Sequence, residues 1–89
     1  MIGHVEIWSK NGCPHCSRAK NLLTTHGIPF NEKILGVNFT KENLLESYPT
    51  AKSYPVIVVD GFYIGGYTQL ATKLNEEFSD PRQLLNEHA

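Results

Sequence analysis

Residues 4–35 carry the pattern that most restricts how this 89-residue chain can fold. "HVEIWS", residues 4–9, is rich in β-branched and aromatic residues and predicts a strand. From Pro14 onward apolar residues recur at spacings of three and four, which predicts a helix that begins at Pro14 and is capped by Gly27. Residues 28–35 predict a second strand. A strand, helix, strand unit of this length implies a right-handed parallel crossover, and therefore an α/β fold.

The second half of the chain predicts a helix, a hairpin and a last helix. Residues 39–48, "FTKENLLESY", favour a short amphipathic helix that Pro49 breaks. "PVIVVDGFYIGG", residues 55–66, favours an antiparallel hairpin, because Asp60-Gly61 suits a type I′ turn. A helix is predicted from about Thr68, with a fresh cap at Asp80 and Pro81. The apolar faces of the two helices are assigned to Phe39, Leu44, Leu45 and Tyr48, and to Leu70, Ala71, Leu74 and Phe78. The predicted order is β-α-β-α-β-β-α, in one domain over residues 1–89.

The net charge and the first residues of the chain argue against several classes of protein. Nine acidic and eight basic residues give a net charge of -1, so there is no electrostatic footprint for nucleic acid or anionic lipid. The first residues, "MIGHVEIWSK", lack a basic head followed by an apolar run, as a secretion signal would need. We therefore expect a cytoplasmic protein that binds neither nucleic acid nor membrane. We also expect it to be a monomer.

The two cysteines, Cys13 and Cys16, allow three interpretations. A structural zinc site needs four ligands, of which the pair supplies half, and the four histidines form no pair at metal-ligand spacing. A structural disulfide would close a very short loop and is disfavoured in a reducing compartment. A reactive pair is favoured, because a cysteine at a helix N-terminus faces free N–H groups that favour the thiolate. On this interpretation Cys13 is the nucleophile and Cys16 resolves its mixed disulfides.

Three motifs in order, "VEIWSKNGCPHC", "SYPVIVVDGFYIGG" and "IGGYTQL", resemble the glutaredoxins, and most of all the compact glutaredoxins of large tailed bacteriophages. The resemblance implies a thioredoxin-like fold, with a four-stranded mixed sheet flanked by helices. It implies a thiol-disulfide oxidoreductase that uses glutathione as cosubstrate and holds no metal. Its implied substrates are protein disulfides and glutathione mixed disulfides, with ribonucleotide reductase as a candidate partner.

The resemblance also implies which residues bind glutathione. Lys10 occupies the place of the lysine that helps hold the glutathione carboxylate and the thiolate. Pro55 matches the family's cis-proline, which turns the backbone of Tyr54 toward the cysteine of glutathione. A solvated lysine and a proline that merely begins a strand are the alternatives.

The double glycine before the last helix is expected to bind the γ-glutamyl end. Gly66 would let the backbone approach the ligand, and Tyr67 and Thr68 would offer amides to its carboxylate. A branched side chain at Gly66 is expected to block this approach and to disfavour a positive φ. A glycine turn capped by Thr68 is the structural alternative.

Three positions depart from the usual glutaredoxin pattern. His15, among the predicted glutathione-site residues, stands where tyrosine is usual, and its ring N–H can bond a thiolate and make the pair more oxidising. Tyr54 stands where valine is typical, and Thr68 where many relatives carry an aspartate for the ammonium of glutathione. A redoxin reduced by thioredoxin reductase is the alternative function, followed by an iron-sulfur carrier, which Pro14 disfavours by stiffening the loop.

Overall fold

The computed structural model of the protein describes residues 3–78 and contains the predicted elements in the predicted order. The elements are β1 (Val5–Ser9), α1 (Pro14–Thr25), β2 (Phe30–Ile34), α2 (Lys41–Ser47), β3 (Val56–Val59), β4 (Phe62–Gly65) and α3 (Tyr67–Phe78). The predicted cap at Asp80 and Pro81, and the side chain of Phe78, lie outside the described residues. No helix within residues 3–78 is long and apolar enough to cross a membrane.

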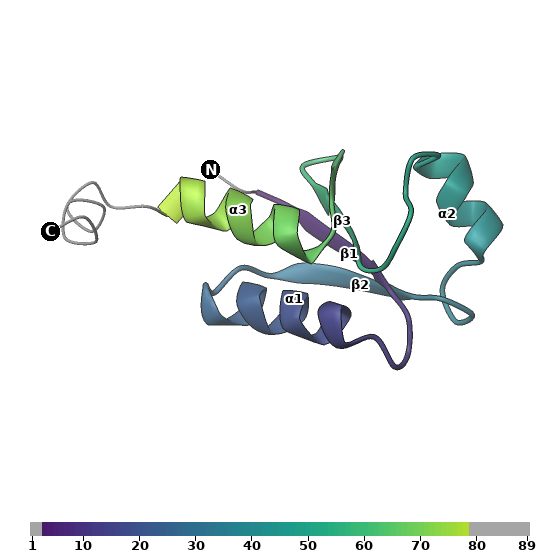
Figure 1. The fold of residues 1–89 in the computed structure, drawn as a ribbon, viewed down its shortest axis with the longest axis horizontal. Helices are drawn as coiled ribbons and strands as arrows, with labels where there is room; N and C mark the ends of the chain where they lie inside the picture. Colours follow the sequence, from purple (N-terminus) through teal and green to yellow (C-terminus); the bar gives the residue numbers. More distant parts are fainter. Residues whose placement is uncertain (1–2, 79–89) are drawn as a thin grey trace, which may run out of the picture.

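The four strands form one mixed sheet in the order β2-β1-β3-β4. β1 runs parallel to β2 and antiparallel to β3, and β3 pairs antiparallel with β4 (Figure 1). The parallel crossover and the hairpin predicted from the sequence are both confirmed. β1 is hydrogen-bonded on both sides, so the loop that follows Ser9 leaves the sheet from a central, well-fixed strand.

The helices cover the two faces of the sheet unequally. Alternate residues of β1 and β3 point to opposite faces, as the pleat of a strand requires. One face packs against α1 and α3, which lie side by side in Figure 1, and its buried cluster consists of Val5, Ile7, Ala19, Leu23, Ile57, Val59, Leu70 and Leu74. The opposite face packs against α2 and the loop before it, and its buried cluster consists of Trp8, Phe39, Leu44, Val56 and Val58.

The turn between β3 and β4 also anchors the beginning of the chain. Asp60 and Gly61 have φ values of 51° and 85°, and a type I′ turn requires positive φ at both positions. The Asp60 carboxylate accepts hydrogen bonds from the backbone N–H of His4 at 2.8 Å and of Gly3 at 3.3 Å. These bonds, the one from His4 first, hold the pKa of Asp60 below its usual range.

The helix predicted over residues 39–48 is shorter than expected. Thr40 is its N-cap: Thr40 Oγ1 accepts from the N–H of Asn43 at 3.1 Å, and Asn43 Oδ1 accepts from the N–H of Thr40 at 3.0 Å. This reciprocal cap satisfies the free amides at the helix start and leaves Phe39 outside the helix. Phe39 is still buried, in a bridge to Leu35, whereas Leu45 is 37% exposed.

A small polar network joins α1 to the sheet. Glu32 Oε2 on β2 lies 2.9 Å from Lys20 Nζ on α1 and accepts a 2.7 Å hydrogen bond from Ser9 Oγ on β1. The bond from Lys20 first, and then that from Ser9, lowers the pKa of Glu32. Ser9 is buried, so this network satisfies a hydroxyl that water does not reach.

We expect Glu32→Gln to lower the free energy of unfolding by about 1 kcal/mol at neutral pH. A carboxyl whose pKa is lowered by folding stabilises the protein at pH values above its unfolded pKa, and this stability is lost as the pH falls through the folded pKa. The difference from the parent should therefore shrink on acidification, in urea titrations of both proteins with the disulfide intact. Glu46→Gln, on the exposed surface of α2, is the control and should show little difference at either pH. A Glu32→Gln deficit that stayed constant down to acid pH would show that the charge of Glu32 is not what matters.

Candidate active site

Cys13 lies where the loop after β1 turns into α1. Gly12, with φ of 73°, turns the chain, and Cys13 is the extended N-cap residue of the helix. Its Sγ accepts a hydrogen bond from the N–H of Cys16 at 3.1 Å. Pro14 occupies the first turn, where its missing N–H costs no helical hydrogen bond. The sulfur thus receives a backbone N–H at the positive end of the helix, and both features favour a thiolate.

The two cysteines differ in exposure and are joined by a disulfide. Cys16 is 2% exposed, whereas Cys13 is only partly buried. The disulfide between them means that the structure represents the oxidised form of the pair. Within residues 3–78 neither cysteine belongs to a group of three or more potential metal ligands. A substrate disulfide can reach Cys13 more easily than Cys16, and the roles of attack by Cys13 and resolution by Cys16 stay predictions.

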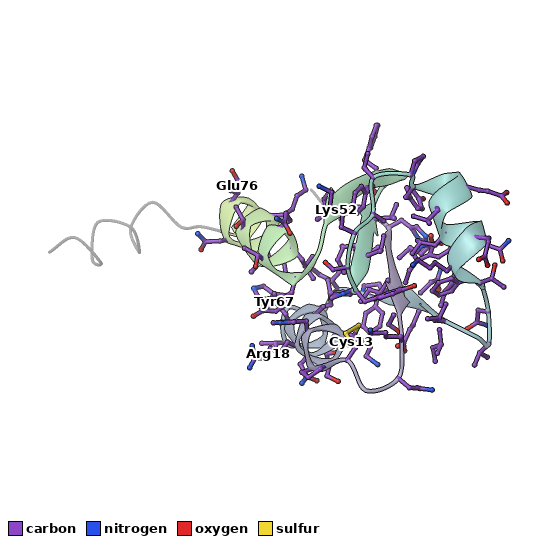
Figure 2. The ribbon with its side chains drawn as sticks, turned by 45° about the vertical axis from the view of Figure 1, so that its right-hand side comes forward. Cys13, Arg18, Lys52, Tyr67 and Glu76 are labelled. Carbon is purple, nitrogen blue, oxygen red and sulfur yellow. A yellow bond between two sulfur atoms is a disulfide. The ribbon has the colours of Figure 1, made fainter. Side chains whose placement is uncertain are left out.

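A pocket of about 200 Å³ opens next to the start of α1. Its lining consists of His15, Ser53, Tyr54, Pro55, Gly66, Tyr67, Thr68 and Gln69. The structure therefore gathers six of the residues predicted to bind glutathione, from three separate segments. The rings of His15 and Tyr67 lie 6.4 Å apart and link the start of α1 to the start of α3. Figure 2 shows Cys13 with its disulfide and Tyr67 at these neighbouring helix ends.

The wall of the pocket before β3 is formed by Tyr54 and Pro55. The peptide bond between them is cis, as predicted, and Pro55 is buried. The Tyr54 ring lies 6.4 Å from the ring of Phe39, which belongs to the buried cluster beneath α2. This packing holds the bulky side chain of Tyr54 at a position where valine is typical of the family that the sequence resembles.

Lys10 is not part of the pocket lining but lies beside it. Its Nζ is 5.4 Å from the centroid of the Tyr54 ring, within the range of a cation-π contact. The side chain is otherwise exposed. Tyr54 thus places the charge of Lys10 next to the pocket, so that an anionic ligand in the pocket would lie near a cation.

Gly65 and Gly66 are required for different reasons, and the positive φ was predicted at the wrong one of the two. The positive φ, 124°, is at Gly65, not at Gly66. A Cβ on Gly65 would also lie 2.6 Å from Cγ of Gln69. At Gly66 a Cβ would lie 3.3 Å from the carbonyl oxygen of Pro55, a backbone atom with little room to move. Gly66 therefore serves the close approach of two backbone segments, and Gly65 serves the turn.

Sequence reasoning missed two lining residues, Ser53 and Gln69. Gln69 is the third residue of α3, and its Oε1 accepts a hydrogen bond from the N–H of Gly66 at 2.9 Å. A glutamine at this helix position is part of the known capping pattern, so the sequence did contain a signal for Gln69. Ser53 has no comparable pattern around it.

Comparisons with known proteins agree with this geometry. The family model "Glutaredoxin" matches residues 5–64. Glutaredoxin 3 of Escherichia coli K12 is 35% identical over 69 residues, which are 78% of this chain and 83% of that protein. The crystal structure of glutaredoxin 1 from Francisella tularensis superposes with a TM-score of 0.71 at 25% identity, covering 86% of this chain and 98% of that one. A buckwheat glutaredoxin-glutathione complex superposes with a TM-score of 0.70 at 23% identity, covering 82% and 69%, and shows the shared fold.

The family model covers most of the chain and includes Cys13, Cys16 and the cis-proline segment. The fold, with its mixed sheet and three helices, is that of the solved glutaredoxins. The redox pair occupies the start of α1, as the chemistry of thiol-disulfide exchange requires. The chain belongs to the glutaredoxin family and is a thiol-disulfide oxidoreductase.

Proposed function

We propose that this glutaredoxin uses glutathione to reduce protein disulfides and glutathione mixed disulfides in a reducing, cytoplasmic compartment. The observation that carries the proposal is the pocket of about 200 Å³ that adjoins the start of α1, where Cys13 accepts the N–H of Cys16. The buckwheat relative, which shares the fold, was solved with glutathione. Ribonucleotide reductase is one candidate among the protein disulfides that such a monomer would reduce.

The first half-reaction reduces the substrate. The Cys13 thiolate attacks one sulfur of the substrate disulfide, forms a mixed disulfide and releases the other substrate sulfur as a thiolate. The Cys16 thiolate then attacks the sulfur of Cys13 and releases the second substrate thiolate. Two electrons have moved from the protein to the substrate, and the Cys13–Cys16 disulfide of the structure is the product.

The second half-reaction restores the dithiol. A glutathione thiolate attacks the sulfur of Cys13, the more exposed member of the pair, and Cys16 leaves as a thiolate. A second glutathione attacks the glutathione sulfur of this mixed disulfide, so glutathione disulfide and reduced Cys13 result. In the pocket the cis-peptide segment at Tyr54 would face the cysteine of glutathione. The amides of Tyr67 and Thr68 would face its γ-glutamyl carboxylate, and Lys10 would neutralise negative charge nearby.

We expect Cys16→Ser to separate two activities. Releasing glutathione from a small mixed disulfide needs only Cys13, whereas releasing Cys13 from a bulky protein partner needs an internal thiol. The variant should keep most of its turnover with a glutathionylated peptide and lose most of its reduction of a protein disulfide such as insulin. Both are measured with glutathione and glutathione reductase. Cys13→Ser is the control and should lose both activities.

The same assays decide between the two reductants. The proposal predicts turnover of the parent with glutathione and its reductase, and little turnover with thioredoxin reductase. Efficient reduction by thioredoxin reductase, without turnover by glutathione, would replace the proposal with a thioredoxin-like redoxin. Equal loss of both activities in Cys16→Ser would instead show that Cys16 does more than resolve.

We expect Gly66→Val to raise the KM for glutathione more than tenfold, because its Cβ and methyl groups would meet the carbonyl oxygen of Pro55 and enter the pocket. Gly66→Ala, whose Cβ needs a shift of only a few tenths of an ångström, should have a smaller effect. Thr68→Ala should raise the KM by no more than about fivefold, since it removes at most one hydrogen bond of about 1 kcal/mol. Circular dichroism of each variant checks that the fold survives. Equal KM values for all three variants and the parent would remove the pocket from the glutathione site.

A further inference from the structure

The pocket beside Cys13 is lined by hydroxyl, amide, imidazole and backbone groups, and none of its lining side chains is acidic. A charged group that the structure places next to it is the ammonium of Lys10, over the ring of Tyr54. The pocket is thus lined without an acidic side chain and has a cation at its side. Such a site attracts anions and offers no ion-pair partner to a cation.

The side chain of Gln69 adds to this character, because its orientation is determined by its hydrogen bond. The N–H of Gly66 can only donate, so the atom that receives it at 2.9 Å must be the carbonyl oxygen of the Gln69 amide. The amide nitrogen, with its two N–H donors, has no hydrogen-bond partner within residues 3–78. Gln69 therefore uses one lone pair of its carbonyl oxygen within the helix cap and has both amide N–H donors available for a ligand.

The N-terminus of α3 also favours an anionic ligand over a cationic one. The first N–H groups of a helix have no partner within the helix, and the positive end of its dipole favours anions over cations. The γ-glutamyl end of glutathione carries a carboxylate and an ammonium on the same carbon. The amides at the start of α3 would face the carboxylate, whereas none of the described lining side chains is a carboxylate that could pair with the ammonium.

We propose, on the basis of the glutathione function proposed above, that this pocket binds its thiol ligand through carboxylate groups and does not recognise the α-ammonium. The ligand class then extends to carboxylate-bearing, low-molecular-weight thiols whose amino group is blocked or absent. Gln69 is the specificity-determining residue, since it lines the pocket with an uncharged amide where an acidic side chain would create an ammonium site.

The test is a competition for Cys13. The full-length Cys16→Ser protein, reduced, is mixed with equal, excess amounts of two mixed disulfides, in which glutathione or N-acetylglutathione is joined to a nitrothiobenzoate. The Cys13 thiolate attacks the peptide sulfur, the aromatic thiolate of lower pKa leaves, and the adduct stays on Cys13 because no resolving thiol is present. After a rapid acid quench, mass spectrometry gives the ratio of the two adducts, which differ by one acetyl group. We expect a ratio close to one.

Gln69→Glu in the same Cys16→Ser background tests whether a negative charge in the pocket creates a preference for the free amine. One glutamate oxygen can still accept the N–H of Gly66, which preserves the cap, while the other brings a negative charge into the pocket. This variant should favour the free-amine adduct by about two- to fivefold, the range of an exposed ion pair. Thr68→Asp, a second way to add the charge, should shift the ratio in the same direction. Asn21→Glu, an exposed α1 residue that does not line the pocket, adds the same charge and should leave the ratio unchanged.

A strong preference of the Gln69-containing protein for the free amine, tenfold or more, would overturn this inference but leave the glutathione function in place. An unchanged ratio in both Gln69→Glu and Thr68→Asp would also overturn it. A ratio close to one shared by all variants, together with equally rapid attack on a small uncharged disulfide, would contradict the glutathione pocket itself. The two proposals therefore fail in distinguishable ways.

Discussion

The hydrogen bond from the N–H of Cys16 to Sγ of Cys13 joins the fold of this protein to its chemistry. It exists because the chain leaves the central strand β1, turns at Gly12 and enters α1 with Cys13 as its N-cap. A strand paired on both sides fixes where the loop starts, and a helix packed on the sheet fixes where it ends. Cys13 is thereby held at the positive end of a helix, while Cys16, one turn later, is buried beneath it.

The pocket depends on a second helix start being brought beside the first. α1 and α3 pack on the same face of the sheet through one aliphatic cluster that includes Leu23 and Leu70. As a consequence, the ring of His15 at the start of α1 lies 6.4 Å from that of Tyr67 at the start of α3. Two helix N-termini on one side of the molecule give it a surface rich in N–H donors. This explains why a reactive sulfur and a site suited to carboxylates occur together.

The other face of the sheet supports the site through aromatic packing. The rings of Trp8 and Phe39 lie 4.7 Å apart, and Phe39 also contacts Tyr54. Burial, and then the charge of Glu6, raises the pKa of Tyr48, which packs edge-on against Trp8. Through this cluster the α2 side of the protein positions Tyr54, and Tyr54 in turn holds the ammonium of Lys10.

The features that the sequence alone determined are those that depend on neighbouring residues. The helix start at Pro14, the hairpin at Asp60-Gly61 and the placement of Cys13 at a helix N-terminus follow from local dihedral preferences and hydrophobic spacing. The cis-proline at Pro55 was predicted from the resemblance to glutaredoxins, and not from the local pattern.

Only the tertiary structure decided which distant atoms meet. It brought the carbonyl oxygen of Pro55 to 3.3 Å from where a Cβ of Gly66 would lie, assigned the positive φ to Gly65, and kept Phe39 in the core although it lies outside α2. These features depend on how segments from different elements meet. The sequence pattern cannot rank them, because their energies depend on how the helices and the sheet pack together.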